Sequence, residues 1–307
     1  MPTKKNKGKQ GTRKNKIKDL NCNPLVKKSK ISSKSCLTPS VIDKLKESWN
    51  ASHSDNIIAS NTPIKIWKEL KNKLAVCENE KCWLKTIKDD KVRATIEENI
   101  FAPDQPAEWH KNPSQWLTNF DILKVLKQYD DAHPEFHFIG PTPIDFDSRP
   151  YEDDTCVWKD LCSFDLQKQI NKNYTKFGIV FNLDKHNQSG SHWTSMFIDL
   201  ENNIIFYFDS AGSKIPNEVF KFAKRVIKQG LQLNSPKKLT FHENHPIEHQ
   251  FENNECGMYS LYFIITMLTG QIGNKMLNKM DKRVEYFKTK RIKDDDMFKY
   301  RKIYFNS

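Results

Sequence analysis

Apolar residues follow a helical period in the first part of this chain and a strand-like pattern in much of the remainder. Up to about residue 130 they recur at intervals of three and four, as on the buried side of an amphipathic helix. The first such segment has the residues of a helix start, because Thr38 suits an N-cap and Pro39 suits the first helical position. Helices are predicted over 38–49, 63–76, 89–100 and 118–129.

After about residue 135 the apolar runs become short and rich in β-branched and aromatic residues, which is typical of strands. Strands are predicted over 136–140, 177–183, 192–200, 203–210 and 238–242. The turn residues Glu201 and Asn202 separate two of these strands and predict a hairpin. A helix over 216–229 is expected to end at Gly230, a residue suited to the position after a helix.

The segment 255–270 is apolar on nearly every side, so a helix there has no polar face and is expected to be buried. The order of elements predicts an α+β fold, with a mainly antiparallel sheet packed on this buried central helix and a helical extension at the N-terminus. The polar segment 271–307 is expected to form a helix on the surface.

Charge divides the chain further. The 307 residues contain 50 Lys and Arg and 38 Asp and Glu, but twelve of the basic residues and a single acid, Asp19, lie in the first 40 positions. We predict a basic disordered tail over 1–37, a helical unit over 38–105 and the main domain over 106–307. Residues 1–36 suit non-specific contact with DNA, nuclear import or simple solubilisation, whereas the lack of interleaved aromatic residues argues against base stacking.

Several protein classes are excluded or disfavoured. The longest apolar run, 258–268, is too short to span a bilayer, and no apolar signal segment follows the first residues. The chain is therefore expected to be neither secreted nor bound to a membrane. The chain has seven cysteines, an odd number, and no C-x-x-C pair, so we do not expect a disulfide framework. We therefore expect the protein in a reducing compartment. Cys77 and Cys82 are interpreted as core thiols, with zinc as the alternative.

Cys256 is the first candidate for chemistry, because it stands at the start of the helix predicted to be buried. The free N–H groups and the dipole of a helix N-terminus favour a thiolate. Gly257, the next residue, permits close approach of a substrate or a backbone. A buried core cysteine is the alternative, and a nucleophile would also need a base.

His192 and Asp209 supply a base and a group to orient it. His192 begins one strand of the predicted hairpin and Asp209 ends the other, so the two are expected side by side across one rung of the ladder. Asp209 would then fix the tautomer of the imidazole. Gln250, six residues before Cys256, is a candidate donor to an oxyanion. Two alternatives stay open, because three histidines, His242, His245 and His249, precede Cys256. One of them could be the base in place of His192, or they could form a zinc site with Cys256.

The combined pattern resembles one family closely. The segment from Gly190 to Gly212, with its H-W and D-S pairs, and the Q-x5-C-G motif are similar to the ubiquitin-like-protein (SUMO) proteases and the adenovirus protease clan. Trp116-Leu117-Thr118-Asn119 resembles a further family motif with one residue displaced. The flanking segments resemble the versions found in giant viruses and other large nucleocytoplasmic DNA viruses.

The resemblance implies a papain-like, adenain-like thiol protease with the triad Cys256, His192 and Asp209 and with Gln250 in the oxyanion hole. It also implies cleavage after small residues, such as Gly-Gly or Gly-Ala, in a channel formed by Trp193 and Trp116. We expect a monomer without metal or cofactor, acting on protein substrates with Gly-rich sites. Maturation of viral structural precursors in the virion and the host cytoplasm is the favoured role. Alternatives are an isopeptidase for a ubiquitin-like modifier, an acetyltransferase, and a nucleic-acid-binding protein that uses the tail.

Overall fold

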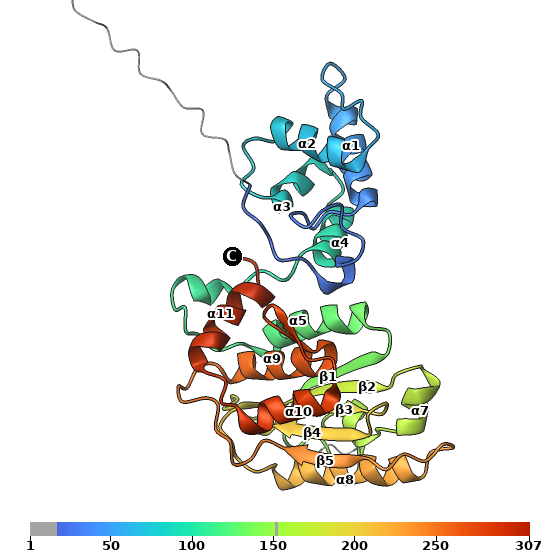
Figure 1. The fold of residues 1–307 in the computed structure, drawn as a ribbon, viewed down its shortest axis with the longest axis vertical. Helices are drawn as coiled ribbons and strands as arrows, with labels where there is room; N and C mark the ends of the chain where they lie inside the picture. The colour runs from blue at the N-terminus through green and yellow to red at the C-terminus, as the bar shows by residue number, and fades with distance from the viewer. Residues whose placement is uncertain (1–16, 151–152) are drawn as a thin grey trace, which may run out of the picture. The chain divides into compact units, whose positions relative to one another are not determined.

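The computed structural model describes residues 17–150 and 153–307 and divides into two compact units, which meet in the sequence between Phe101 and Ala102 (Figure 1). The division lies four residues before the position that the sequence suggested. Each unit has its own hydrophobic core and is described by itself. No helix within the described ranges has the length and apolar character needed to cross a bilayer.

The N-terminal unit is helical. Its elements are η1 (Pro24–Val26), α1 (Pro39–Ser52), α2 (Pro63–Lys73), α3 (Glu80–Trp83), η2 (Leu84–Thr86) and α4 (Asp90–Ile100). Side chains from α1, α2 and the fully buried Trp83 form its core. At its centre the Glu80 carboxylate accepts hydrogen bonds from the Cys36 amide at 3.0 Å and the Trp67 indole at 2.6 Å. Burial raises the pKa of Glu80 in spite of these bonds.

Residues 17–37 belong to this unit, which corrects the prediction of a disordered tail over 1–37. Val26, Cys36 and Leu37 are buried in the helical core, and Asn23 donates a hydrogen bond to the carbonyl of Glu98. The few apolar residues of this basic stretch suffice because α1, α2 and α4 supply the remaining surface. Residues 1–16, which carry the first part of the predicted tail, lie outside the described residues.

Six of the seven cysteines are paired, contrary to the expectation that the chain has no disulfide framework. The pairs are Cys22–Cys36, Cys77–Cys82 and Cys156–Cys162, with Cα atoms 5.1, 5.5 and 6.5 Å apart. Each joins residues close in sequence, where a turn of the chain brings the two Cα atoms within reach. The interpretation of Cys77 and Cys82 as unpaired core thiols is therefore wrong, and Cys256 is the free cysteine.

The second unit has three layers, with a sheet between two groups of helices (Figure 1). Its strands are β1 (Phe136–Pro143), β2 (Lys176–Asn182), β3 (Trp193–Asp199), β4 (Ile204–Phe208) and β5 (Thr240–Glu243), adjacent in that order. A separate two-stranded ribbon consists of β6 (Gln271–Ile272) and β7 (Lys275–Met276). The helices are η3 (Ala107–His110), α5 (Asn119–Ala132), α6 (Lys159–Cys162), α7 (Leu166–Asn171), α8 (Asn217–Leu231), α9 (Cys256–Thr269), α10 (Met280–Thr289) and α11 (Asp294–Tyr304).

The α+β class and the predicted hairpin are confirmed, and the sheet proves to be mixed. The central strand β3 runs antiparallel to both β2 and β4, while β1 pairs with β2 and β5 pairs with β4 in parallel. The parallel pairs arise because helices connect β1 to β2 and β4 to β5, and a helical crossover returns the chain in the same direction. Alternation along β3 directs Phe197 to the α9 face and its neighbours Met196 and Ile198 to the α8 face.

Two expectations about helices are corrected. Gly230 lies within α8, which continues to Leu231, and a Cβ at Gly230 would lie 2.9 Å from the carbonyl oxygen of Lys237. The glycine therefore allows close packing of the 237–239 segment and does not end the helix. The segment 271–307 forms β6, β7, α10 and α11 instead of one surface helix. Phe287, Met297 and Tyr304 from this segment are buried in the same core as α9.

Gly178 on β2 lets α9 and the Phe136 ring pack closely against the sheet. A Cβ atom there would lie 2.8 Å from the Phe136 ring and 2.9 Å from Cγ2 of Ile264. We expect Gly178→Ala to lower the free energy of unfolding by about 1–3 kcal/mol, because it overpacks a close-packed core. Urea denaturation measures this change. Gly273→Asn is the control, since nothing lies within 4 Å of a Cβ there and its φ of +53° suits Asn; an equal loss in both variants would contradict the argument.

Candidate active site

The site begins at the N-terminus of α9. Cys256 is the first residue of this helix, Glu255 is the N-cap, and the cysteine is only 2% exposed. A Cβ on Gly257 would lie 3.0 Å from Cβ of Leu117 and 3.4 Å from Cδ1 of Trp193. The missing side chain thus lets the residue after His192 pack directly against the start of the helix. The first amides of α9 have no partner within the helix and face the same region.

His192 and Asp209 meet beside this helix start. Nε2 of His192 lies 2.7 Å from Oδ1 of Asp209, and the carboxylate is 1% exposed. Nδ1 is the ring nitrogen left for the thiol of Cys256, which is near enough to act on the pKa of the imidazole. His192 directly precedes β3, Asp209 directly follows β4 and Cys256 begins α9, so the structure brings the predicted candidates together.

The contact is diagonal, which differs from the predicted rung. Ser195 pairs with Phe208 across β3 and β4, and this register continued by one residue sets Asp209 opposite Thr194. The Asp209 side chain therefore reaches past the end of the strand to His192. Its position is held by Asn244, whose side chain accepts from the Asp209 amide at 2.9 Å and donates to the Asp209 carbonyl at 2.7 Å. The Ala211 amide also donates to Oδ1 of Asp209.

The environment favours a protonated imidazole. Burial acts to lower the pKa of His192, but the hydrogen bonds with Asp209 and Cys256, together with the charges of both groups, outweigh burial and raise this pKa to about 10. The imidazole therefore carries a proton at neutral pH in this state of the site, next to the sulfur. Such a ring can both stabilise a thiolate and return its proton to a leaving group.

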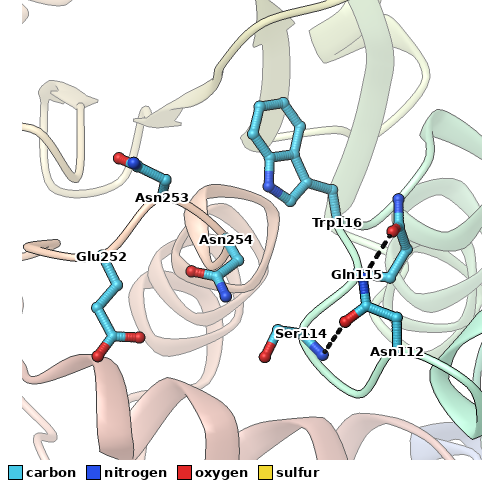
Figure 2. A pocket seen from close by; sticks show the side chains of 7 residues that line it. All are labelled: Asn112, Ser114, Gln115, Trp116, Glu252, Asn253 and Asn254. Carbon is cyan, nitrogen blue, oxygen red and sulfur yellow. Dashed lines mark hydrogen bonds between the residues drawn. The ribbon is translucent and has the colours of Figure 1, made fainter.

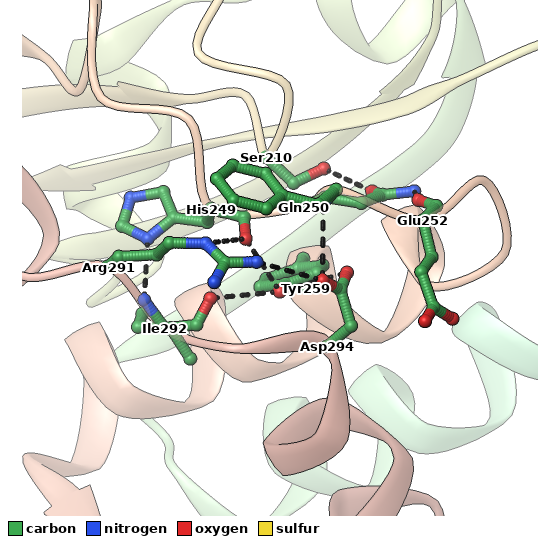
Figure 3. A network of polar contacts seen from close by, with 9 residues as sticks. Ser210, His249, Gln250, Glu252, Tyr259, Arg291, Ile292 and Asp294 are labelled. Carbon is green, nitrogen blue, oxygen red and sulfur yellow. Dashed lines mark hydrogen bonds and ion pairs between the residues drawn. The ribbon is translucent and has the colours of Figure 1, made fainter.

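Gln250 is held in a fixed orientation close to the helix start (Figure 3). The Ser210 hydroxyl donates to Oε1 of Gln250 at 2.7 Å, and the Gln250 amide donates to the Ser210 carbonyl at 2.9 Å. Nε2 of Gln250 donates one hydrogen to the carbonyl of Glu252, which leaves its second hydrogen for another acceptor. Ser210 thus has a role that the sequence did not reveal, although its place next to Asp209 was a usable signal.

His249 is structural, so it is neither an alternative base nor free to bind a metal. Nε2 bonds the Phe287 carbonyl at 3.0 Å, and Nδ1 accepts from the Ile292 amide at 3.1 Å (Figure 3). Burial, with a smaller contribution from Arg291, lowers the pKa of His249 to about 4. His245 is also engaged, through Nδ1 and the Gly212 carbonyl at 2.8 Å. Across residues 17–150 and 153–307, no group of three or more His, Cys, Asp or Glu is arranged to hold a metal ion.

A groove of about 670 Å³ runs past His192. Trp116 and Trp193 both line it, together with the loop 184–191 and the segment around Trp158. Trp193 is half-buried and donates from its indole to the Leu117 carbonyl at 3.1 Å, whereas Trp116 is 39% exposed. Thr118 caps α5 directly after Trp116, in a capping box with Asp121. The two tryptophans predicted to form a channel therefore line the same groove.

A second hollow, of about 560 Å³, is also lined by Trp116 (Figure 2). The segment 112–116 forms one wall and residues 252–254 form the other. Its lining is mostly amide side chains together with the Trp116 ring and the Glu252 carboxylate. Residues 252–254 lie between Gln250 and Cys256 in the sequence, so this hollow adjoins the candidate catalytic loop.

Comparison with known proteins finds a family that the second unit resembles. Residues 179–305 match the Ulp1 protease family, C-terminal catalytic domain. Proteins of that family are cysteine hydrolases, and the matched residues include His192, Asp209, Gln250 and Cys256.

Viral proteins are among the relatives of this chain. A putative thiol protease of Acanthamoeba polyphaga mimivirus is 32% identical over 162 residues, which cover 52% of this chain and 49% of that protein, so the chain spans about half its length. A SUMO-1 cysteine protease of African swine fever virus is 29% identical over 198 residues, 62% of this chain and 68% of that protein. The crystal structure of the African swine fever virus protease matches 95% of this chain and 97% of its own with a TM-score of 0.61 and 22% identity, which shows a shared fold.

The charge on His192 can be tested through its partner Asp209. A raised pKa means that the protonated His192 stabilises the folded state fully below pH 6.5, and that this contribution is lost as the pH rises through about 10. We expect Asp209→Asn to lower the titration midpoint of His192, because the carboxylate provides the main favourable contact with the charged ring. NMR of the histidine ring nitrogens measures the midpoint.

Asp199→Asn is the matched control. Asp199 is a fully buried carboxylate at the other end of the same hairpin, where it accepts from the amides of Glu201 and Asn202. We expect the His192 midpoint to stay unchanged in this variant. A wild-type midpoint near the ordinary value of about 6.5, or equal shifts in both variants, would contradict the assignment of His192 and Asp209 as a coupled pair.

Proposed function

We propose that this chain is a cysteine endopeptidase with Cys256 as nucleophile, His192 as acid and base, and Asp209 as the group that orients the imidazole. The observation that carries the proposal is the 2.7 Å pair of His192 and Asp209 beside a free cysteine at the N-terminus of a buried helix. A nucleophile, a base and an orienting carboxylate in that order are the requirements for acyl transfer.

The chemistry follows from these positions. The sulfur of Cys256 attacks the carbonyl carbon of the scissile peptide, and the proton held by His192 passes to the leaving amine. The peptide C–N bond breaks and a thioester remains on Cys256. Water then attacks the thioester, with His192 taking a proton from the water, and the acid product leaves. Asp209 keeps Nδ1 of the ring directed at the sulfur throughout.

Gln250 is the proposed side-chain donor to the oxyanion. Its Oε1 is fixed by Ser210 and one Nε2 hydrogen by the Glu252 carbonyl, so the remaining hydrogen is pre-oriented. The amide of Cys256, in the first turn of α9, is the second donor. Donors that are already oriented before the reaction lower the barrier more than donors that must rearrange.

Narrow access to the sulfur supports cleavage after small residues such as Gly-Gly or Gly-Ala. Cys256 is 2% exposed, and Leu117 and Trp193 pack against the helix turn that carries it. A peptide that reaches the sulfur between Trp193 and Trp116 has to be thin, which favours residues with little or no side chain. We take Gly-rich segments of proteins as the substrate class.

Viral structural precursors are the proposed substrates, processed during maturation in the virion or in the host cytoplasm. The resemblance to proteases of two large DNA viruses supports this role. Isopeptidase activity on a ubiquitin-like modifier is the second candidate, which the printed name of the African swine fever virus relative, a SUMO-1 cysteine protease, favours. Contact of the basic residues 1–36 with DNA would retain the enzyme near packaged genomes.

The catalytic proposal is tested with three variants of the full chain. We expect Cys256→Ala to abolish cleavage of Gly-Gly-X peptides, His192→Ala to reduce kcat by about 10²–10⁴-fold and Gln250→Ala by about 10²–10³-fold. His242→Ala, on β5 outside the site, is the control and should retain activity. Full activity of Cys256→Ala would overturn the proposal. Parallel assays with Gly-Gly-X peptides and SUMO conjugates separate the two substrate classes.

The two tryptophans should act differently on substrate choice. Trp193 supports the site through its bond to Leu117, so we expect Trp193→Ala to lower both kcat and stability. Trp116 is more exposed, so Trp116→Ala should leave the melting temperature nearly unchanged. We expect this variant to have a smaller ratio of kcat/KM for Gly to kcat/KM for Ala or Leu at the residue before the scissile bond. Kinetics with peptides that differ at this one residue measure the preference. Unchanged discrimination in Trp116→Ala would show that Trp116 does not form the channel.

A further inference from the structure

We propose that Arg301 of α11 is a positioning residue for the active site, because it ties the start of α9 and the segment that presents Trp116 to one guanidinium group. The proposal rests on the protease function above. It adds a residue that lies 45 positions after Cys256 in the sequence, outside every motif that identified the site.

The first contact of Arg301 is with the residue next to the nucleophile. Nε of Arg301 lies 3.0 Å from Oε2 of Glu255, and Nη2 lies 2.7 Å from Oε1, so the pair is bidentate. Both side chains are only 4% exposed. Glu255 is the N-cap of α9 and immediately precedes Cys256, so this fork fixes the first turn of the catalytic helix from outside the helix.

The second contact is with the segment that carries Trp116. Nη1 of Arg301 donates to the carbonyls of Pro113 at 2.7 Å and Gln115 at 3.1 Å. Trp109 stacks on the same guanidinium at 4.2 Å and donates from its indole to the Gln115 carbonyl at 2.8 Å. A further bond from Nη2 reaches the Asn254 carbonyl at 3.4 Å. All five N–H groups of the guanidinium are thereby used, which lysine with its three donors cannot reproduce.

These contacts span the hollow shown in Figure 2. Its two walls are 112–116 and 252–254, and Arg301 bonds to the backbone of both. One side chain therefore links the segment that carries Trp116 to the loop that leads to Cys256. At the other end of the same loop, Arg291 donates to the His249 carbonyl at 3.1 Å, and the Phe251 amide donates to Asp294 (Figure 3). The C-terminal segment thus holds the loop from Gln250 to Cys256 at both ends.

A positioning role differs from a purely structural one in what a mild substitution changes. Arg301→Lys keeps the charge beside Glu255 and loses the fork, so the chain should fold while the start of α9 and Trp116 lose their common anchor. We expect kcat for a Gly-Gly-X peptide to fall at least tenfold and KM to rise severalfold. Glu255→Gln should act in the same direction, and the effects of the two substitutions should be less than additive because they remove one interaction.

Arg283→Lys is the matched control. Arg283 on α10 holds the opposite end of α9, with Nη1 donating to the Met267 carbonyl at 2.6 Å and Nε to the Leu277 carbonyl at 2.8 Å. We expect this variant to lower the melting temperature to a similar extent and to leave kcat and KM unchanged. Equal kinetic effects in Arg301→Lys and Arg283→Lys would overturn the positioning role.

The rate at which chloroacetamide alkylates Cys256 separates this proposal from the proposed function, since it needs no substrate. We expect Arg301→Lys to alter this rate at least threefold, with no change in Arg283→Lys. Suppose that the wild type cleaves the peptide and that Arg301→Lys has the same alkylation rate and the same kinetics. This outcome would refute the positioning role and leave the protease function standing. Suppose instead that Arg301→Lys alters the alkylation rate but the wild type cleaves no Gly-rich protein or conjugate. This outcome would refute the protease function and leave the positioning role standing.

Discussion

The packing of α9 against β3 is the constraint on which the candidate site depends. All but the last of the fourteen residues of α9 are buried, and Gly257 lets Trp193 and Leu117 press against its first turn. Each large apolar side chain of the helix contributes about 1.5–3 kcal/mol through burial, so a rotation or shift of the helix would be costly. The sulfur of Cys256 therefore has one position relative to His192, and the hairpin holds Asp209 behind that histidine.

Hydrogen bonds and ion pairs hold the loop before α9, which apolar packing does not fix. The loop from Gln250 to Cys256 has no core of its own, because Phe251, Glu252 and Asn253 are exposed. Its backbone is instead held from Ser210 on one side and from Arg291, Asp294 and Arg301 on the other. Buried polar groups of this kind are costly unless each has a partner, so the arrangement is rigid once it forms.

Restricted access is the functional consequence of this rigidity. A sulfur that is 2% exposed beside a half-buried tryptophan leaves little room for a side chain next to it. The proposed preference for Gly-rich segments rests on this close packing of α9. The same packing connects the stability of the domain to the chemistry, because the residues that anchor α9 also shape the groove.

Local sequence patterns predicted much of this molecule. The helices α1, α2, α4 and α5 follow from their apolar period, and the buried character of α9 follows from its composition. The spacing of His192, Asp209, Gln250 and Cys256 identified the candidate site, since a hairpin constrains which residues meet across it. Residues 17–37, the six paired cysteines and the parallel outer strands were not predicted, because each depends on surfaces supplied by distant segments.

The bond between Arg301 and Glu255 shows the reason most clearly. The two residues are 46 positions apart, and Arg301 also bonds Pro113, which lies 188 positions away. Nothing in the pattern around Arg301 distinguishes it from the charged residues beside it, because its neighbours are defined by how α11 packs and not by its own sequence. Periodicity and spacing specify which elements form and which motif they carry. The partners of a buried charge depend on the path of the whole chain, so they emerge only when the domain has folded.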